Sequence, residues 1–97
     1  MKKEDFKTFL SSLNKLETMD TLIRSGEQLE NTYKTALDQA TLTEEKAQEF
    51  RTKIYFDDAL TPWDKKWYPE TLKLYYEFIH NETLPPLQFK TKGQNRG

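Results

Sequence analysis

Apolar residues in the first part of the chain recur at the spacing of an α-helix rather than at the alternation of a strand. The first apolar set follows separations of three, one, three and three positions, which places its members on one helical face. It predicts a helix over residues 3–16 and consists of Phe6, Phe9, Leu10, Leu13 and Leu16.

The most regular stretch predicts a second helix over residues 19–40. Its members alternate by three and four positions, like the a and d positions of a coiled coil, over three heptads: Met19, Leu22, Gly26, Leu29, Tyr33, Ala36 and Ala40. The small residues of this face would let another helix approach closely. We expect the face to pack within the chain, because the domain needs it for its own core. A homodimer through the same face is the alternative.

A third helix is predicted over residues 43–57. Thr41-Leu42-Thr43-Glu44 has the S/T-x-x-E pattern of a capping box, and Ala47, Phe50 and Ile54 continue the helical spacing. Because the link to the preceding helix is very short, the two helices should form a long antiparallel hairpin.

The break at residues 57–62 introduces an aromatic-rich end of the chain. Thr61 can cap a helix and Pro62 can occupy its first position, so a short helical turn should follow. Pro69 is expected to interrupt or restart the helix, and a fourth helix is predicted over 69–80. Residues 84–89 favour an extended, polyproline-like strand, and residues 90–97 contain no apolar side chain.

These elements predict an all-α fold: a small four-helix, bundle-like domain over 1–80 with a long central antiparallel hairpin, followed by an extended or disordered basic tail over 81–97. The chain has 97 residues, of which 35% are hydrophobic and 32% charged. A core of this size is modest, and such a chain often completes it against a partner or a second copy. Residues 17–49 contain eight acidic and three basic residues, so the hairpin should present an acidic surface.

The composition limits the chemistry and the cellular compartment expected for the protein. No cysteine is present, which excludes disulfides, thiolate metal sites and cysteine nucleophiles. Neither a signal-peptide pattern nor an apolar run long enough for a membrane span occurs. We therefore expect a cytoplasmic protein that does not enter a membrane. The excess of 12 lysines over 3 arginines suggests an AT-rich genome, such as that of a low-GC bacterium or a phage.

Aromatic residues gather in one segment. Eight of the thirteen lie between residues 55 and 78, more than one helix and a loop readily bury. Most should fill the core, but some are expected on the surface, where Trp and Tyr are enriched at binding hot spots. The predicted partner-binding residues are Trp63, Trp67, Tyr68, Tyr75 and Phe89, with the first three exposed.

Basic residues beside these rings give an alternative, nucleic-acid binding. Such residues can hold phosphates while aromatic rings stack on bases. The candidates are Lys65, Lys66, Lys90, Lys92 and Arg96. Three nearby acids, Asp57, Asp58 and Asp64, would repel a phosphate backbone, so we favour a protein partner.

Catalytic and metal-binding patterns are weak. His80 is the only histidine, and at the end of a helix it is better placed to interact with the helix dipole. No nucleophile elbow, glycine-rich phosphate loop or metal-ligand spacing occurs. The sequence therefore predicts a non-enzymatic protein-binding regulator, inhibitor or adaptor without a cofactor. A self-assembling structural protein is a further alternative.

Overall fold

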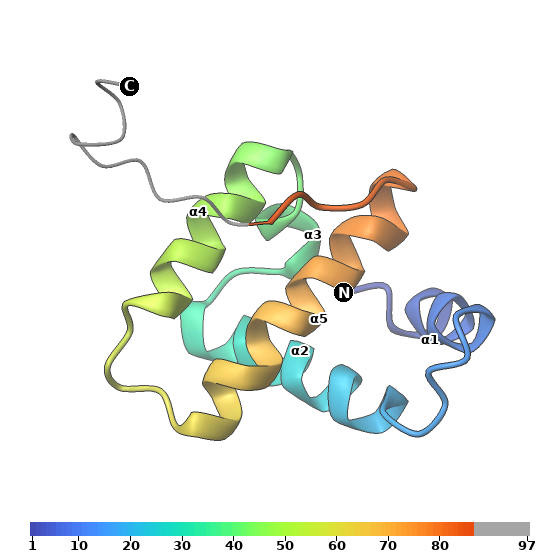
Figure 1. Cartoon of the computed structure of the whole chain (residues 1–97), viewed down its shortest axis with the longest axis horizontal. Coiled ribbons are helices and arrows are strands. Elements are labelled where there is room, and N and C mark those ends of the chain that lie inside the picture. Colours follow the sequence, from blue (N-terminus) through green and yellow to red (C-terminus); the bar gives the residue numbers. More distant parts are fainter. Residues whose placement is uncertain (87–97) are drawn as a thin grey trace.

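The computed structural model describes residues 1–86, and within them the fold is all-α. Five helices and no strand are present: α1 (Lys3–Ser12), α2 (Met19–Tyr33), α3 (Leu37–Ala40), α4 (Glu44–Tyr55) and α5 (Pro62–His80) (Figure 1). The predicted all-α class is therefore confirmed. Phe89, Lys90, Lys92 and Arg96 lie outside the described residues. In the described part of the chain, no helix combines the length and the apolar character that crossing a bilayer requires.

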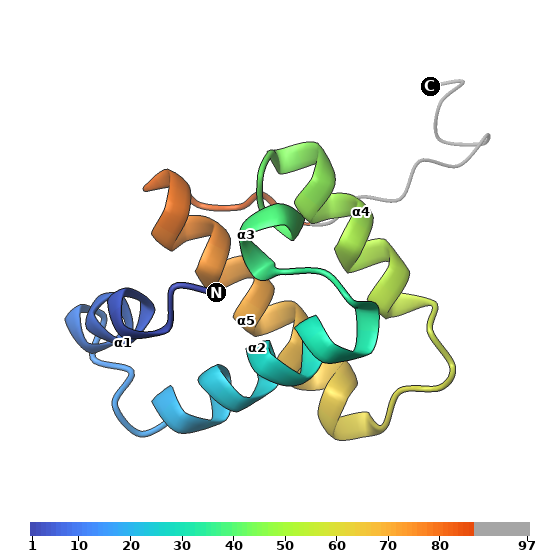
Figure 2. The same ribbon diagram turned by 180° about the vertical axis from the view of Figure 1, so that it is seen from behind.

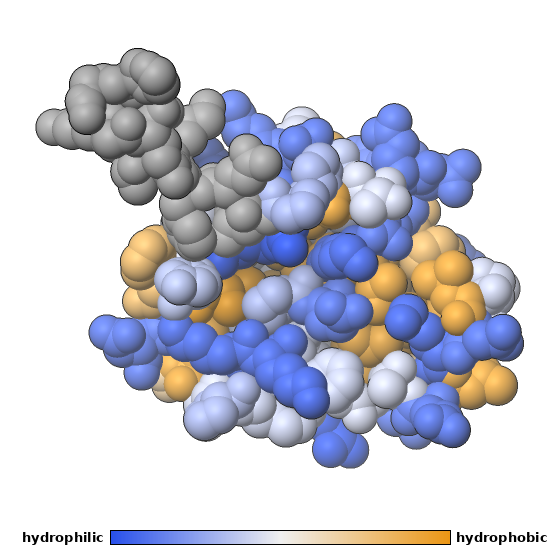
Figure 3. Space-filling model, in the orientation of Figure 1, coloured by the Kyte–Doolittle hydropathy of each residue, from blue (hydrophilic) through white to orange (hydrophobic). Residues whose placement is uncertain are grey.

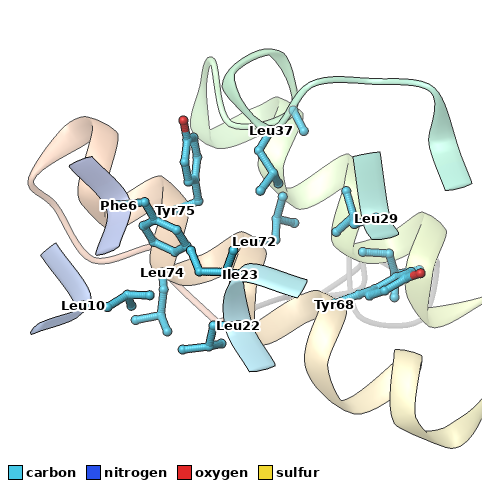
Figure 4. Packing of buried hydrophobic residues seen from close by; sticks show 12 residues of the cluster. Phe6, Leu10, Leu22, Ile23, Leu29, Leu37, Tyr68, Leu72, Leu74 and Tyr75 are labelled. Atoms are coloured by element: carbon cyan, nitrogen blue, oxygen red, sulfur yellow. The ribbon is translucent and has the colours of Figure 1, made fainter. Parts of the chain in front are cut away.

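Helix α5 is the central element of the fold. It packs against each of the other four helices, with α2 crossing it on one face and α4 lying alongside it (Figures 1 and 2). Figure 4 shows side chains from α1, α2 and α5 meeting around Ile23 and Leu72, both of which are buried. Side chains of α5 that face a neighbouring helix are buried in this core. Only the aromatic rings on the uncovered part of α5 remain at the surface.

The predicted helix over 19–40 is wrong in its length, because the chain breaks it at Lys34. This residue has left-handed backbone angles, with φ 54°, and its N–H bonds to the carbonyl of Glu30. After the break, the Glu30 carboxylate accepts a 2.7 Å hydrogen bond from the backbone N–H of Leu37 and so satisfies the start of α3. The long hairpin of two continuous helices is replaced by α2, the short α3 and α4.

Gly26 lies where the chain folds back after this break. A β-carbon at Gly26 would lie 3.0 Å from Cδ1 of Leu37 and 3.3 Å from the sulfur of Met1. The glycine thus admits the side chains of Met1 and Leu37, and a helix that continued past Lys34 would carry Leu37 away from this position. The close approach expected from small residues occurs, but the partner is the chain's own next turn.

The ends of α1 and α4 also differ from the prediction. Helix α1 stops at Ser12, and Leu13 and Leu16, expected on its buried face, are exposed. Helix α4 is capped by Thr43, whose hydroxyl accepts from the N–H of Lys46 at 3.1 Å. The predicted cap, Thr41, is instead buried and donates to the carbonyl of Leu37 at 2.7 Å.

Helix α5 begins at the predicted cap and ends at His80 as predicted, but it is one continuous helix and not a short turn followed by a second helix. Thr61 and Asp64 form a reciprocal capping box, with Pro62 at the first position. Pro69 does not interrupt the helix, which runs through it for 19 residues. A proline removes one helical hydrogen bond, and here the burial of Tyr68, Leu72 and neighbouring side chains compensates for that loss.

Residues after α5 still belong to the packed body. Leu84 is 1% exposed and packs with Ala47 and Tyr76. The carbonyl of Pro85 accepts hydrogen bonds of 2.8 Å from both Gln48 and Arg51 on α4. The segment 83–86 has no regular secondary structure and crosses from α5 to α4 (Figure 1). Packing against α4 and α5 therefore continues past residue 80 to Leu84 and Pro85.

Candidate functional site

The aromatic segment divides between core and surface. Tyr68 and Tyr75 are 2% and 0% exposed, which corrects the expected exposure of Tyr68 and makes both rings part of the core. Figure 4 shows Tyr68 beside Leu29 of α2 and Tyr75 beside Phe6 of α1. Trp63 is exposed in the first turn of α5, and Trp67 is half-buried one turn later.

A pocket of about 280 Å³ lies beside Trp67. Helix α5 contributes Lys66, Trp67 and Glu70, and the other side is formed by α2 and the loop before it. Among residues 1–86, the lining consists of Lys15, Thr18, Leu22, Lys66, Trp67 and Glu70. Two predicted residues, Trp67 and Lys66, therefore share one site. Lys15, more than fifty positions earlier, could not be connected with them from the sequence.

Local hydrogen bonding positions Lys15 at the edge of this pocket. Its backbone N–H returns to the carbonyl of Leu10 at 3.1 Å, and the preceding Asn14 has a φ of 60°. This tight turn ends α1 in the manner of a helix C-cap. The Thr18 hydroxyl in turn donates to the carbonyl of Lys15 at 3.4 Å, so the loop that supplies two lining residues is fixed by its own backbone.

The charged groups of the pocket are available to a ligand. The ammonium of Lys66 lies 5.1 Å from the centre of the Trp67 ring, within the range of a cation–π contact. Among residues 1–86, neither lysine of the pocket forms an ion pair, and the same holds for Glu70. The pocket thus combines an aromatic wall with two cations and one carboxylate at its edge.

Lys65 points to the other side of α5 and does not join Lys66. Its ammonium donates a 2.6 Å hydrogen bond to the carbonyl of Tyr55, one of the last carbonyls of α4. This side of α5 has a separate hollow of about 560 Å³, lined by Arg51, Ile54, Tyr55, Lys65 and Pro69. The two neighbouring lysines predicted to act together therefore belong to different surfaces.

A polar cluster that the sequence did not reveal surrounds Tyr75. The Met1 ammonium lies 3.0 Å from Glu30 and 3.4 Å from Asp38, and the Tyr75 hydroxyl donates to Asp38 at 2.6 Å. Burial disfavours the charged ammonium, but the two carboxylates outweigh it and raise its pKa above 8.0. These groups hold α2, α3 and α5 together, and no spacing in the sequence indicates them.

His80 lies in the last turn of α5, as expected. Its Nε2 is 2.6 Å from the carbonyl of Thr41, the residue that caps the end of α3, and its ring packs at a tilt on Tyr76 with centres 4.3 Å apart. The first contact connects the end of α5 to the end of α3, and the second lies within α5, so both are structural. Within residues 1–86, no group of three or more metal-ligating side chains is gathered.

The surface around these features is mostly hydrophilic. On the face drawn in Figure 3, hydrophobic residues form separate small areas among hydrophilic ones. A comparison of the chain with protein-family models, with curated proteins and with solved structures finds no match. The fold and the pocket therefore define a small all-α protein whose central helix presents two tryptophans in its first two turns.

Proposed function

We propose that this chain is a non-enzymatic protein-binding module, a regulator, inhibitor or adaptor, that acts in the cytoplasm through the first half of α5. The observation that carries the proposal is the different placement of its two tryptophans. Trp63 is 38% exposed, whereas Trp67 packs on the core and still lines a pocket. Large, rigid aromatic rings of this kind often supply most of the binding energy of an interface.

The local structure supports this use of the helix. The capping box at Thr61 and the proline at the first position fix the turn that carries Trp63. Tyr68 and Leu72 anchor the following turns in the core. A binding surface on a helix held in this way loses little conformational entropy on association.

Capture of partners from an extract of the source cells tests the proposal. The immobilised full chain should retain a specific protein, and Trp63→Ala should weaken that binding by about 2 kcal/mol, or about thirtyfold in Kd, if Trp63 is a hot spot. Leu42→Ala is the matched control, because Leu42 is also a large exposed apolar residue, 53% exposed, at a different place in the fold. Equal retention by both variants and the unaltered chain would count against the proposal.

The alternative, nucleic-acid binding, has less support, because Lys65 and Lys66 lie on different sides of α5 and do not form one basic surface. A salt titration of DNA and RNA binding separates it from the leading proposal. Contacts to phosphates give an affinity that falls steeply with salt, whereas a protein interface centred on Trp63 depends on salt only modestly.

A further inference from the structure

The pocket beside Trp67 differs in charge from the chain around it. Residues 17–49 have eight acidic and three basic side chains, yet two of the three charged groups that line the pocket are lysines. Lys66 is exposed and Lys15 is partly exposed. Because neither has an ion-pair partner in the described part of the chain, both charges are free to attract an anion.

The pocket is small, and its apolar part is formed by Trp67 and Leu22. Trp67 is half-buried and packs against the main core, and Leu22 lies behind it at 1% exposure, so the apolar surface that the indole ring presents is fixed in place. A volume of about 280 Å³ lies just below the usual range for sites that enclose a complete small ligand. The pocket is therefore the right size for one large apolar side chain and leaves the rest of its ligand outside.

We infer that the pocket binds an acidic peptide segment of a protein partner, with one apolar side chain against Trp67 and Leu22 and carboxylates near Lys15 and Lys66. This inference rests on the proposed protein-binding function and names the chemistry of the partner. Complementary charge of this kind selects partners and speeds their encounter.

Two other occupants fit the charges less well. The chain's own residues 90–97 contain Lys90, Lys92 and Arg96 and no acid, so they would be repelled by the two lysines. A nucleic-acid strand carries a charge on every nucleotide and would bring a row of phosphates past Glu70, which lines the pocket. A short peptide needs only one or two carboxylates near the lysines.

The test uses the full chain and three blocked pentapeptides, followed by ¹H–¹⁵N NMR. The probe has the sequence Glu-Asp-Phe-Asp-Glu. One control, Gln-Asn-Phe-Asn-Gln, removes only the charges, and the other, Glu-Asp-Ala-Asp-Glu, removes only the ring. The probe should shift the Trp67 indole N–H and the amides of Lys15 and Thr18, with each control binding about fivefold more weakly, as expected for two exposed ion pairs or one lost apolar contact.

Substitution of the lysines provides the second measurement. The double variant Lys15→Gln/Lys66→Gln should weaken the probe about fivefold, whereas Lys46→Gln/Lys2→Gln removes the same charge from exposed positions elsewhere and should not. The inference is overturned if the probe does not bind, if the amide control binds equally, if the shifts lie elsewhere, or if both double variants behave alike. If capture of a partner is lost in Trp63→Ala but unchanged in Lys15→Gln/Lys66→Gln, the proposed function stands and this inference fails.

Discussion

The hydroxyl of Tyr75 donates a 2.6 Å hydrogen bond to a carboxylate oxygen of Asp38, and this contact joins the middle of α5 to α3. The same hydroxyl accepts a 2.8 Å hydrogen bond from the backbone N–H of Lys2. Three segments that are far apart in the sequence therefore meet at one phenol group. Since the ring of Tyr75 is fully buried against Phe6, this side chain connects the apolar core to the polar cluster above it.

We expect Tyr75→Phe to destabilise the protein by about 2 kcal/mol, because hydrogen bonds to charged groups contribute about 1.5–3 kcal/mol. Urea unfolding followed by circular dichroism measures this change. Tyr76→Phe is the matched control, since the Tyr76 hydroxyl has no hydrogen bond to any residue in 1–86 although its ring is buried. Equal unfolding midpoints for the two variants would show that the contact to Asp38 contributes nothing to stability.

The same contact predicts how stability depends on pH. Burial tends to raise the pKa of Asp38, but the Tyr75 hydroxyl and the Met1 ammonium outweigh it and hold this pKa below 3.8. A carboxyl whose pKa is lower in the folded than in the unfolded state stabilises the fold above its unfolded pKa, and this stability is lost as the pH falls. The stability difference between the unaltered chain and Asp38→Asn should therefore shrink from about pH 4 downward. Urea midpoints at pH 7, 5, 4 and 3 measure it, and a constant difference would contradict the assignment.

Local signals explain what could be predicted from the sequence. Thr61, Pro62 and Asp64 lie within four positions, and the start of α5 needs only their own side chains and backbone. The helical spacing of apolar residues was likewise sufficient for the all-α class. By contrast, α2 ends at Lys34 and Leu37 packs back against Gly26, and a periodic pattern does not contain that contact.

The binding surface was less predictable than the fold. Whether an aromatic residue of α5 is exposed depends on which neighbouring helix covers it, so Trp63 and Tyr68 received the same expectation and have opposite outcomes. The pocket was beyond prediction for a similar reason. Its lining includes both Lys15, in the turn after α1, and Trp67, more than fifty positions later, and only the folded chain brings these two residues together.

The capping box at the start of α5 predicts that the hydroxyl of Thr61, and not its methyl group, stabilises the helix. Thr61→Ala should lower the free energy of unfolding by about 1 kcal/mol, because the hydroxyl accepts a 3.1 Å hydrogen bond from the N–H of Asp64. Thr61→Ser keeps this acceptor and should differ little from the unaltered chain. Thermal and urea unfolding of both variants provide the measurement, and a serine variant as unstable as the alanine variant would exclude a capping role.

The segment after α5 gives the last prediction, which concerns where the packed chain ends. Leu84 is buried against Ala47 and Tyr76, so Leu84→Ala should cost about 2–5 kcal/mol, as for other fully buried leucines. If residues 81–97 were only a solvated tail, the cost would be close to zero. Pro86→Ala is the control within the same segment, because Pro86 is exposed.

Since Pro85 also accepts hydrogen bonds from Gln48 and Arg51, losing Leu84 should increase hydrogen exchange in α4 as well as lower the unfolding midpoint. A lower midpoint with unchanged exchange in α4 would mean that Leu84 stabilises α5 alone.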